Sequence, residues 1–214
     1  KGVEEAGPHH LLADCLAKID RYEEAQKEYD LALNEDPKNT SIRYGYAQFL
    51  TSIQEPEKAI HLLREAIDNS SIDCSLWSLG SQIVNAHIKD SEVALHWTAC
   101  AIEECCTHPE AQKQRGVALL TVGRFEEALP FFEKAPQHAV TEAAKILCQT
   151  SAGKLISLID PDKEEIISTA FIHWYRRLLD YEGESAAQKI AEKIDSLKKT
   201  LPTATRILRE ALAE

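Results

Sequence analysis

The chain has 214 residues, of which 44% are hydrophobic and 28% are charged, and its formal net charge is −11 at pH 7. This charge argues against free nucleic acid as a partner, because phosphate binding needs clustered Lys and Arg side chains. No run approaches the roughly 18 apolar residues of a membrane-spanning helix, so we expect no membrane span. The length fits one or two compact domains or one elongated array.

The first predicted elements are two helices, over about 8–19 and 22–34, which follow a leader at 1–7. Pro8 suits the first turn of the first helix, and the Asp36-Pro37 pair ends the second. The second helix carries a small–large–small stripe at i, i+4 and i+7, formed by Ala25, Tyr29 and Ala32. Such a stripe lets two helices approach closely and pack as a hairpin.

The same arrangement recurs three times along the chain. The clearest copy begins at 123–128, GRFEEA, which matches DRYEEA at 20–25 and continues to Phe132 and Ala135. The alanines that open the four stripes are Ala25, Ala59, Ala94 and Ala128, at steps of 34, 35 and 34 residues. A period near 34 predicts stacked helical hairpins, each of which contacts mainly its neighbours.

This set of motifs strongly resembles the tetratricopeptide repeat family over about residues 8–135. The resemblance implies an all-α fold, a right-handed superhelical array of helical hairpins. It divides the repeats at about 8–39, 40–72, 73–107 and 108–135. We interpret 1–7 as a leader or the tail of a preceding helix.

The period is lost after Pro136, and we interpret 136–214 as degenerate, repeat-like hairpins and capping helices. Asp160-Pro161-Asp162 predicts the start of a helix over about 163–181. Its apolar side would carry Ile166, Ile167, Phe171, Trp174 and Leu178. Another helix is expected over about 184–200, and its polar face would cover the open end of the array.

The six cysteines show no regular spacing and no C-x-x-C motif. They favour a reducing compartment over a disulfide framework, so a cytoplasmic location is expected and a periplasmic one stays open. A soft-metal site is one interpretation of His96, Cys100, Cys105, Cys106 and His108. Their spacing fits no familiar zinc motif, so we expect no metal and no cofactor.

No catalytic signature is present, and the chain is not expected to be an enzyme. The segment 151–154, SAGK, lacks the upstream glycine and the preceding strand of a phosphate-binding loop. Asp160 and Asp162 begin like a calcium loop without its glycine and distal glutamate, so they are better explained as helix capping.

The family resemblance implies a concave peptide-binding groove, lined by the first helix of each hairpin. The candidate groove residues are His10, Asp14, Lys18, Tyr44, Gln48, Thr51, Trp77, Gln82, Lys113 and Val117. Two further points leave this assignment open. Tyr44 could equally pack in the core. The interval from Gly80 to Ala94 is two residues longer than that from Gly116 to Ala128, which leaves the phase of Trp77 and Gln82 open.

Some family members clamp the terminal carboxylate of heat-shock chaperones with paired asparagines. Asp14 and Gln48 stand at those positions here, and a carboxylate facing a carboxylate disfavours this role. The predicted function is a protein–protein interaction scaffold or adaptor that holds a peptide or helix of a partner protein. Two alternatives remain: homo-oligomerisation through the convex face or an end hairpin, and a regulatory repeat region of a larger enzyme such as a glycosyltransferase.

Overall fold

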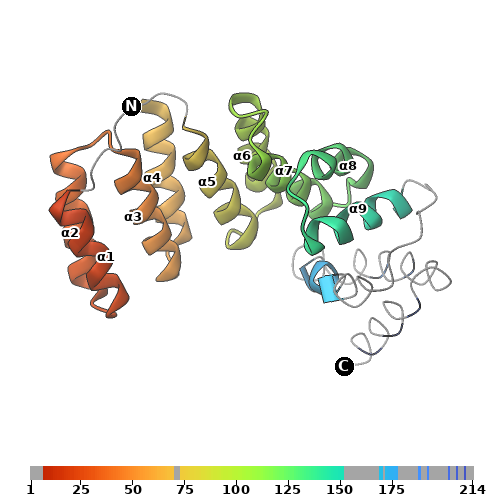
Figure 1. Cartoon of the computed structure of the whole chain (residues 1–214), viewed down its shortest axis with the longest axis horizontal. Coiled ribbons are helices and arrows are strands. Elements are labelled where there is room, and N and C mark those ends of the chain that lie inside the picture. The colour runs from red at the N-terminus through yellow and green to blue at the C-terminus, as the bar shows by residue number, and fades with distance from the viewer. Residues whose placement is uncertain are drawn as a thin grey trace.

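The computed structural model describes residues 7–69, 73–151, 169–170 and 172–177, together with the single residues 188, 192, 202, 206 and 210. Successive helices form an extended array (Figure 1). The helices are α1 (Pro8–Lys18), α2 (Tyr22–Glu35), α3 (Thr40–Ser52), α4 (Pro56–Asn69), α5 (Cys74–Ala86), α6 (Ser91–Glu104), α7 (Pro109–Thr121), α8 (Phe125–Lys134) and α9 (Ala139–Ser151). Residues 172–177 are also helical. The expected all-α repeat fold is confirmed.

Local sequence signals set several helix boundaries. Pro8 and Pro109 begin α1 and α7, where a missing backbone N–H costs nothing. The Asn39 side chain caps α3 by accepting from the N–H groups of Ser41 and Ile42 at 3.0 and 3.2 Å. Asp90 caps α6 in the same way. These signals place the turns that let each pair of helices fold back as a hairpin.

The paired helices approach most closely where a small residue on one helix meets a large side chain on the other. The four stripe-opening alanines are all buried: Ala25, Ala59, Ala94 and Ala128. A Cβ atom added to Gly80 would lie 2.2 Å from the Trp97 ring, and one added to Gly116 would lie 2.9 Å from the Phe132 ring. Side chains larger than hydrogen at these two glycines would therefore push the helices apart.

The hairpins stack so that the odd-numbered helices form one layer. α3 contacts α5, α5 contacts α7, and α7 contacts α9, whereas the even-numbered helices chiefly contact the odd-numbered helices beside them. Because the odd-numbered helices approach one another more closely, the array curves with these helices on its inner side. On this basis we propose the division of 8–135 into four repeats at the boundaries given above.

The structure corrects the expectation that the cysteines form no disulfide. Cys74 at the start of α5 and Cys105 at the end of α6 are joined, with their Cα atoms 5.6 Å apart. The two residues are 31 positions apart in sequence, but the hairpin brings its two ends together. Sequence spacing alone could not show this proximity. The free cysteines among the described residues are Cys15, Cys100, Cys106 and Cys148.

Several expectations for the second half fall outside the described residues. These are the segment at 152–154, the proposed calcium-like residues Asp160 and Asp162, and the helix at 184–200 apart from residues 188 and 192. Within the expected helix at 163–181, the structure describes residues 169–170 and 172–177, and Trp174 is buried there as predicted. Among the described helices, none combines the length and the apolar character needed to cross a bilayer.

Gly80→Ala should destabilise the fold more than Gly116→Ala. The added methyl group at position 80 overlaps the rigid, buried Trp97 ring, and such overpacking costs about 1 to 3 kcal/mol. The better helix propensity of alanine offsets about 1 kcal/mol of this cost at both positions. Urea unfolding followed by circular dichroism measures the difference, and equal stability of the two variants would contradict the close packing described above.

Reduction of the purified, air-oxidised chain should lower its free energy of unfolding by about 3 to 4 kcal/mol, because a bridge across a loop of this length restricts the unfolded chain. Thermal unfolding with and without dithiothreitol measures this effect. The double variant Cys74→Ser, Cys105→Ser is the control, since its melting temperature should not respond to the reductant. Peptide mapping that finds all six thiols free after air oxidation would overturn the assignment.

Candidate functional site

A cavity of about 690 Å³ opens at the inner layer of the array. It lies between the end of α5, one side of α7, the α8–α9 connection and the helical residues 173–177. Its lining comprises Gln82, Asn85, Ala86, Glu110, Lys113, Gln114, Val117, Pro136, Gln137, His138, Val140, His173, Trp174 and Arg177. Four separate segments of the chain therefore build one site.

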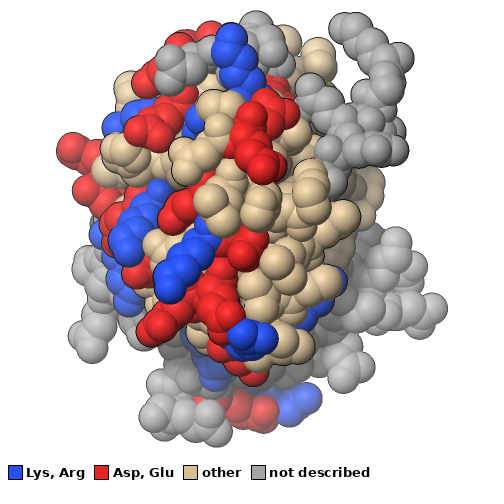
Figure 2. Space-filling model, turned by 90° about the vertical axis from the view of Figure 1, so that its left-hand side faces the viewer, with Lys and Arg blue, Asp and Glu red and all other residues tan. Residues whose placement is uncertain are grey.

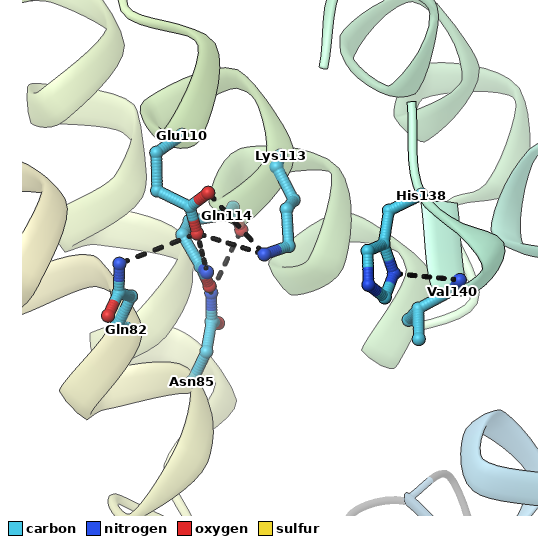
Figure 3. A network of polar contacts seen from close by, with 7 residues as sticks. All are labelled: Gln82, Asn85, Glu110, Lys113, Gln114, His138 and Val140. Carbon is cyan, nitrogen blue, oxygen red and sulfur yellow. Dashed lines mark hydrogen bonds and ion pairs between the residues drawn. The ribbon is translucent and has the colours of Figure 1, made fainter. Parts of the chain in front are cut away.

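A polar network joins α5 to α7 along one wall of this cavity (Figure 3). Three donors converge on Oε1 of Glu110: Nε2 of Gln82 at 3.4 Å, Nε2 of Gln114 at 2.7 Å and Nζ of Lys113 at 3.1 Å. The Asn85 amide donates to Oε1 of Gln114 at 2.9 Å and to its backbone oxygen at the same distance. Asn85 and Gln114 are buried, so these bonds fix the amides in place.

The opposite wall comes from the helical residues 172–177. Nε1 of Trp174 donates to the backbone oxygen of Val140 at 3.0 Å, and its ring packs edge-on against Phe132. The Arg177 guanidinium donates to the backbone oxygen of Asn85 and, at 3.5 Å, to Oγ1 of Thr121. These contacts hold the segment against the ends of α5 and α7, so the chain itself closes one side of the cavity.

The charge in the cavity is more positive than the chain as a whole. Its lining includes two permanently basic side chains, Lys113 and Arg177, and one acidic side chain, Glu110. Burial lowers the pKa of His173 below its ordinary value, and the nearby charge of Arg177 lowers it further. His173 is therefore neutral at pH 7. Among the described lining residues, basic side chains therefore outnumber acidic ones by one, within a chain of net charge −11.

Three of the residues predicted from the sequence meet in this cavity: Gln82, Lys113 and Val117. Tyr44 lines a second, smaller hollow of about 290 Å³ between α3 and the start of α5. Gln48 is exposed on α3, and Thr51 donates its hydroxyl hydrogen to the backbone oxygen of Ala47 at 2.8 Å. The predicted residues therefore fall into two groups along the inner layer.

Two predicted residues take part in packing within the array. His10 is buried, and its ring lies against Gly45 and 5.9 Å from the ring of Tyr29. Trp77 is partly buried against Trp97, with the two ring centroids 5.3 Å apart. In both cases the aromatic ring packs beside a glycine or a neighbouring ring. Helical periodicity alone does not predict these contacts.

The other two predicted residues lie on α1. Asp14 is half-exposed and accepts a hydrogen bond from the hydroxyl group of Tyr29. Burial raises the pKa of Tyr29 above its ordinary value, and the bond to Asp14 raises it further. Lys18 is exposed at the end of the helix. Asp14 therefore has a structural partner within the chain, and Lys18 is accessible.

Several cavity residues are not among those predicted from the sequence. Asn85 lies one helical turn after Gln82, and Glu110 lies one turn before Lys113, so extending the predicted groove positions by one turn would have found both. Gln114 follows Lys113 directly. No sequence pattern pointed to the lining residues His173, Trp174 and Arg177. Their place in the site depends on how the chain returns to the inner layer after α9.

The proposed soft-metal cluster is not assembled. Cys105 is consumed by the disulfide, and Sγ of Cys100 lies 3.9 Å from Nε2 of His96 as an isolated pair. No group of three or more His, Cys, Asp or Glu side chains suited to a metal ion occurs among the residues that the structure describes.

Comparison with known proteins identifies relatives of this arrangement. Residues 16–70 match a family model described as the tetratricopeptide repeat. YrrB, described as a TPR protein with an unusual peptide-binding site, is 18% identical, with a TM-score of 0.54 over 97% of this chain and 92% of its own. PilF of Pseudomonas aeruginosa is 16% identical, with a TM-score of 0.58 over 86% of this chain and 80% of its own.

A thermophilic TPR protein of Thermus thermophilus is also similar. It is 14% identical, with a TM-score of 0.51 over 87% of this chain and 97% of its own. No curated protein sequence matches the chain. At these identities the structural likeness establishes the fold and leaves the ligand open.

Glu110→Ala should destabilise the chain by about 1 to 3 kcal/mol, because the buried Gln114 amide would lose its acceptor. Glu110→Gln keeps an acceptor oxygen at the same place and should recover much of this loss. Urea unfolding of the two variants measures the difference. If Glu110→Ala is as stable as the unmodified chain, the network in Figure 3 does not hold α5 and α7 together.

Proposed function

We propose that this chain, which is a tetratricopeptide repeat protein, acts as a scaffold that binds a segment of a partner protein on its inner layer. The observation that carries this proposal is the cavity between α5, α7 and residues 173–177. It combines amide groups, charged side chains and apolar walls. Such a mixture suits a peptide, whose backbone and side chains need both kinds of contact.

The bound segment is extended or carries one short turn. A volume of about 690 Å³ falls within the range of sites that enclose a drug-sized ligand, and it accommodates a few residues of a peptide. Val140 and Trp174 supply apolar surface, while Gln82 and Lys113 offer polar groups at the opposite wall, where Val117 adds an apolar side chain. The segment would therefore place one apolar side chain between these two walls.

The charge of the cavity favours a segment that carries an acidic side chain near this apolar residue. Lys113 has a half-exposed ammonium group with donors beyond those that it gives to Glu110. Arg177 adds a second positive charge at the far wall. Glu110 is the one carboxylate among the described residues of the lining, so the remaining donors of Lys113 attract an incoming carboxylate on this otherwise acidic chain.

The site is preorganised, which lowers the entropic cost of binding. Asn85 and Gln114 are buried and bonded before any ligand arrives, and Arg177 holds the closing segment against α5. A receptor that changes little on binding keeps more of its interaction energy as affinity. The smaller hollow beside Tyr44 extends the same inner layer towards α3, and we include Tyr44 and Gln48 as a second contact region.

We propose a non-catalytic role. Among the described residues that line the cavity, no nucleophile is paired with a base, and Glu110 accepts hydrogen bonds that join α5 to α7. YrrB, which shares the fold, is described as having a peptide-binding site, and this description supports peptide binding as the first function to test.

Lys113→Glu should weaken binding of peptides selected on the unmodified chain at least tenfold, because it reverses the charge that faces an acidic ligand. A phage-displayed library of random peptides supplies the ligands, and calorimetry on synthetic peptides measures affinity. Lys134→Glu is the matched control, since it makes the same charge change at an exposed position on α8 of the outer layer. Equal loss in both variants would point to overall charge, and no loss in either would refute this site.

Tyr44→Ala combined with Gln48→Ala tests the second contact region. We expect weaker capture of a native partner from the source cell, with little change in melting temperature because both side chains are at least partly exposed. Unchanged capture would remove α3 from the binding surface and leave the cavity beside Lys113 as the site.

A further inference from the structure

Large exposed apolar side chains gather on the first hairpin of the array. On α1 and at its end, Leu11, Leu12 and Ile19 are 57%, 46% and 61% exposed. The free thiol of Cys15 is exposed between them. Positions 11, 12, 15 and 19 lie on one side of a helix, so these four residues form a continuous stripe, which we call the end face. In Figure 2, which views this end of the molecule, uncharged side chains gather on one side and charged side chains on the other.

The internal repeat shows what kind of surface the end face is. The step of 34 residues that takes Ala25 to Ala59 takes the end face to Gly45, Tyr46, Phe49 and Ile53 on α3 and at its end. Tyr46 and Phe49 are buried, and Ile53 packs against the same core cluster. The counterparts of the end face are therefore covered in the next repeat.

The preceding hairpin provides this cover. The ring of Tyr46 stacks on Tyr29 of α2 at 4.8 Å, and its hydroxyl group donates to Asp30 at 2.9 Å. The ring of Phe49 lies 6.2 Å from that of Tyr22 at the start of α2. Gly45 faces His10 of α1. Each counterpart named here thus contacts α1 or α2.

The fourth repeat uses the same position in the same way. The fourth repeat follows the first by 103 residues, the distance from Ala25 to Ala128. The same step takes Leu12 on α1 to Arg115 on α7. The Arg115 guanidinium donates to the backbone oxygen of Leu95 and to Oγ1 of Thr98, both on α6, at 2.6 and 3.2 Å. The end face is therefore a stacking surface of the repeat, and its residues remain exposed in the described structure.

We propose that the end face joins two copies of this chain about a twofold axis that passes close to Cys15. The stripe is self-complementary in an antiparallel pairing of α1 with α1 of the second copy. Leu12 and Ile19 lie three residues before and four residues after Cys15, so each Leu12 meets an Ile19 of the other copy. The smaller Cys15 side chains then face each other, which lets the two helices approach closely at the axis.

Charge complementarity supports the same pairing. Asp14 and Lys18 flank the stripe one helical turn apart, and both have exposed side-chain surface. Antiparallel pairing centred near residues 15 and 16 brings each Asp14 opposite a Lys18 of the second copy. No acidic residue interrupts the stripe itself, so burying it leaves no unpaired carboxylate at the centre of the interface.

Sedimentation velocity over a range of protein concentrations tests this proposal. The unmodified chain should form dimers, and the double variant Leu12→Glu, Ile19→Glu should raise the dimer dissociation constant by about 30-fold or more. Thr107→Glu, Lys134→Glu is the matched control, because it places two glutamates at exposed positions remote from the end face. Circular dichroism should show both double variants folded, since the altered side chains are exposed.

Crosslinking locates the axis. In a chain that carries Cys100→Ser and Cys106→Ser, a short bismaleimide should give a covalent dimer through Cys15, and the further change Cys15→Ser should abolish it. A chain that stays monomeric at every concentration overturns the proposal. So does a dimer that survives Leu12→Glu, Ile19→Glu, or one in which Cys15 does not crosslink. Loss of peptide binding in Lys113→Glu has no bearing on these outcomes, because the cavity lies on α5 and α7.

Discussion

The close approach of two helices at a small residue is the constraint on which the rest of this structure depends. Gly80 against Trp97 and Gly116 against Phe132 leave no room for a side chain on the glycine. The buried alanines Ala25 and Ala59 likewise allow the two helices of the other hairpins to pack closely. Because the two helices of each hairpin pack closely, the hairpins have similar shapes. Each hairpin can therefore stack on the next, and the stacked hairpins form a continuous array.

The array acquires a specific site only where this regular stacking is broken. Over α5 and α7 the helical residues 172–177 return to the inner layer, and Arg177 reaches the end of α5. They close one side of the inner surface while leaving a cavity of about 690 Å³. Residues 172–177 thus shape one side of the cavity. Glu110 joins α5 to α7 and contacts Lys113 beside the cavity, so it links the fold to the proposed binding site.

The fold was largely predictable from the sequence, because helix pairing depends on local patterns. The alanine stripes, Pro8, Pro109 and the Asp36-Pro37 pair mark the hairpins directly. The site was predictable only in part. Lys113 and Val117 follow from helical phase, whereas the long interval from Gly80 to Ala94 left the phase of Gln82 open. The burial of His10 and the packing of Trp77 depend on neighbouring rings, and the position of Arg177 depends on tertiary structure. The Cys74–Cys105 disulfide likewise becomes visible only when the hairpin brings its ends together.

Small-angle X-ray scattering of the variant Leu12→Glu, Ile19→Glu tests the central claim, that stacked hairpins form one open, curved wall. A compact globule of this length would have a radius of gyration of about 17 Å. An extended array predicts a clearly larger radius and a pair-distance distribution with a long tail, as the arrangement in Figure 1 implies. A radius near the globular value with a symmetric distribution would contradict it, because the hairpins would then surround a single centre.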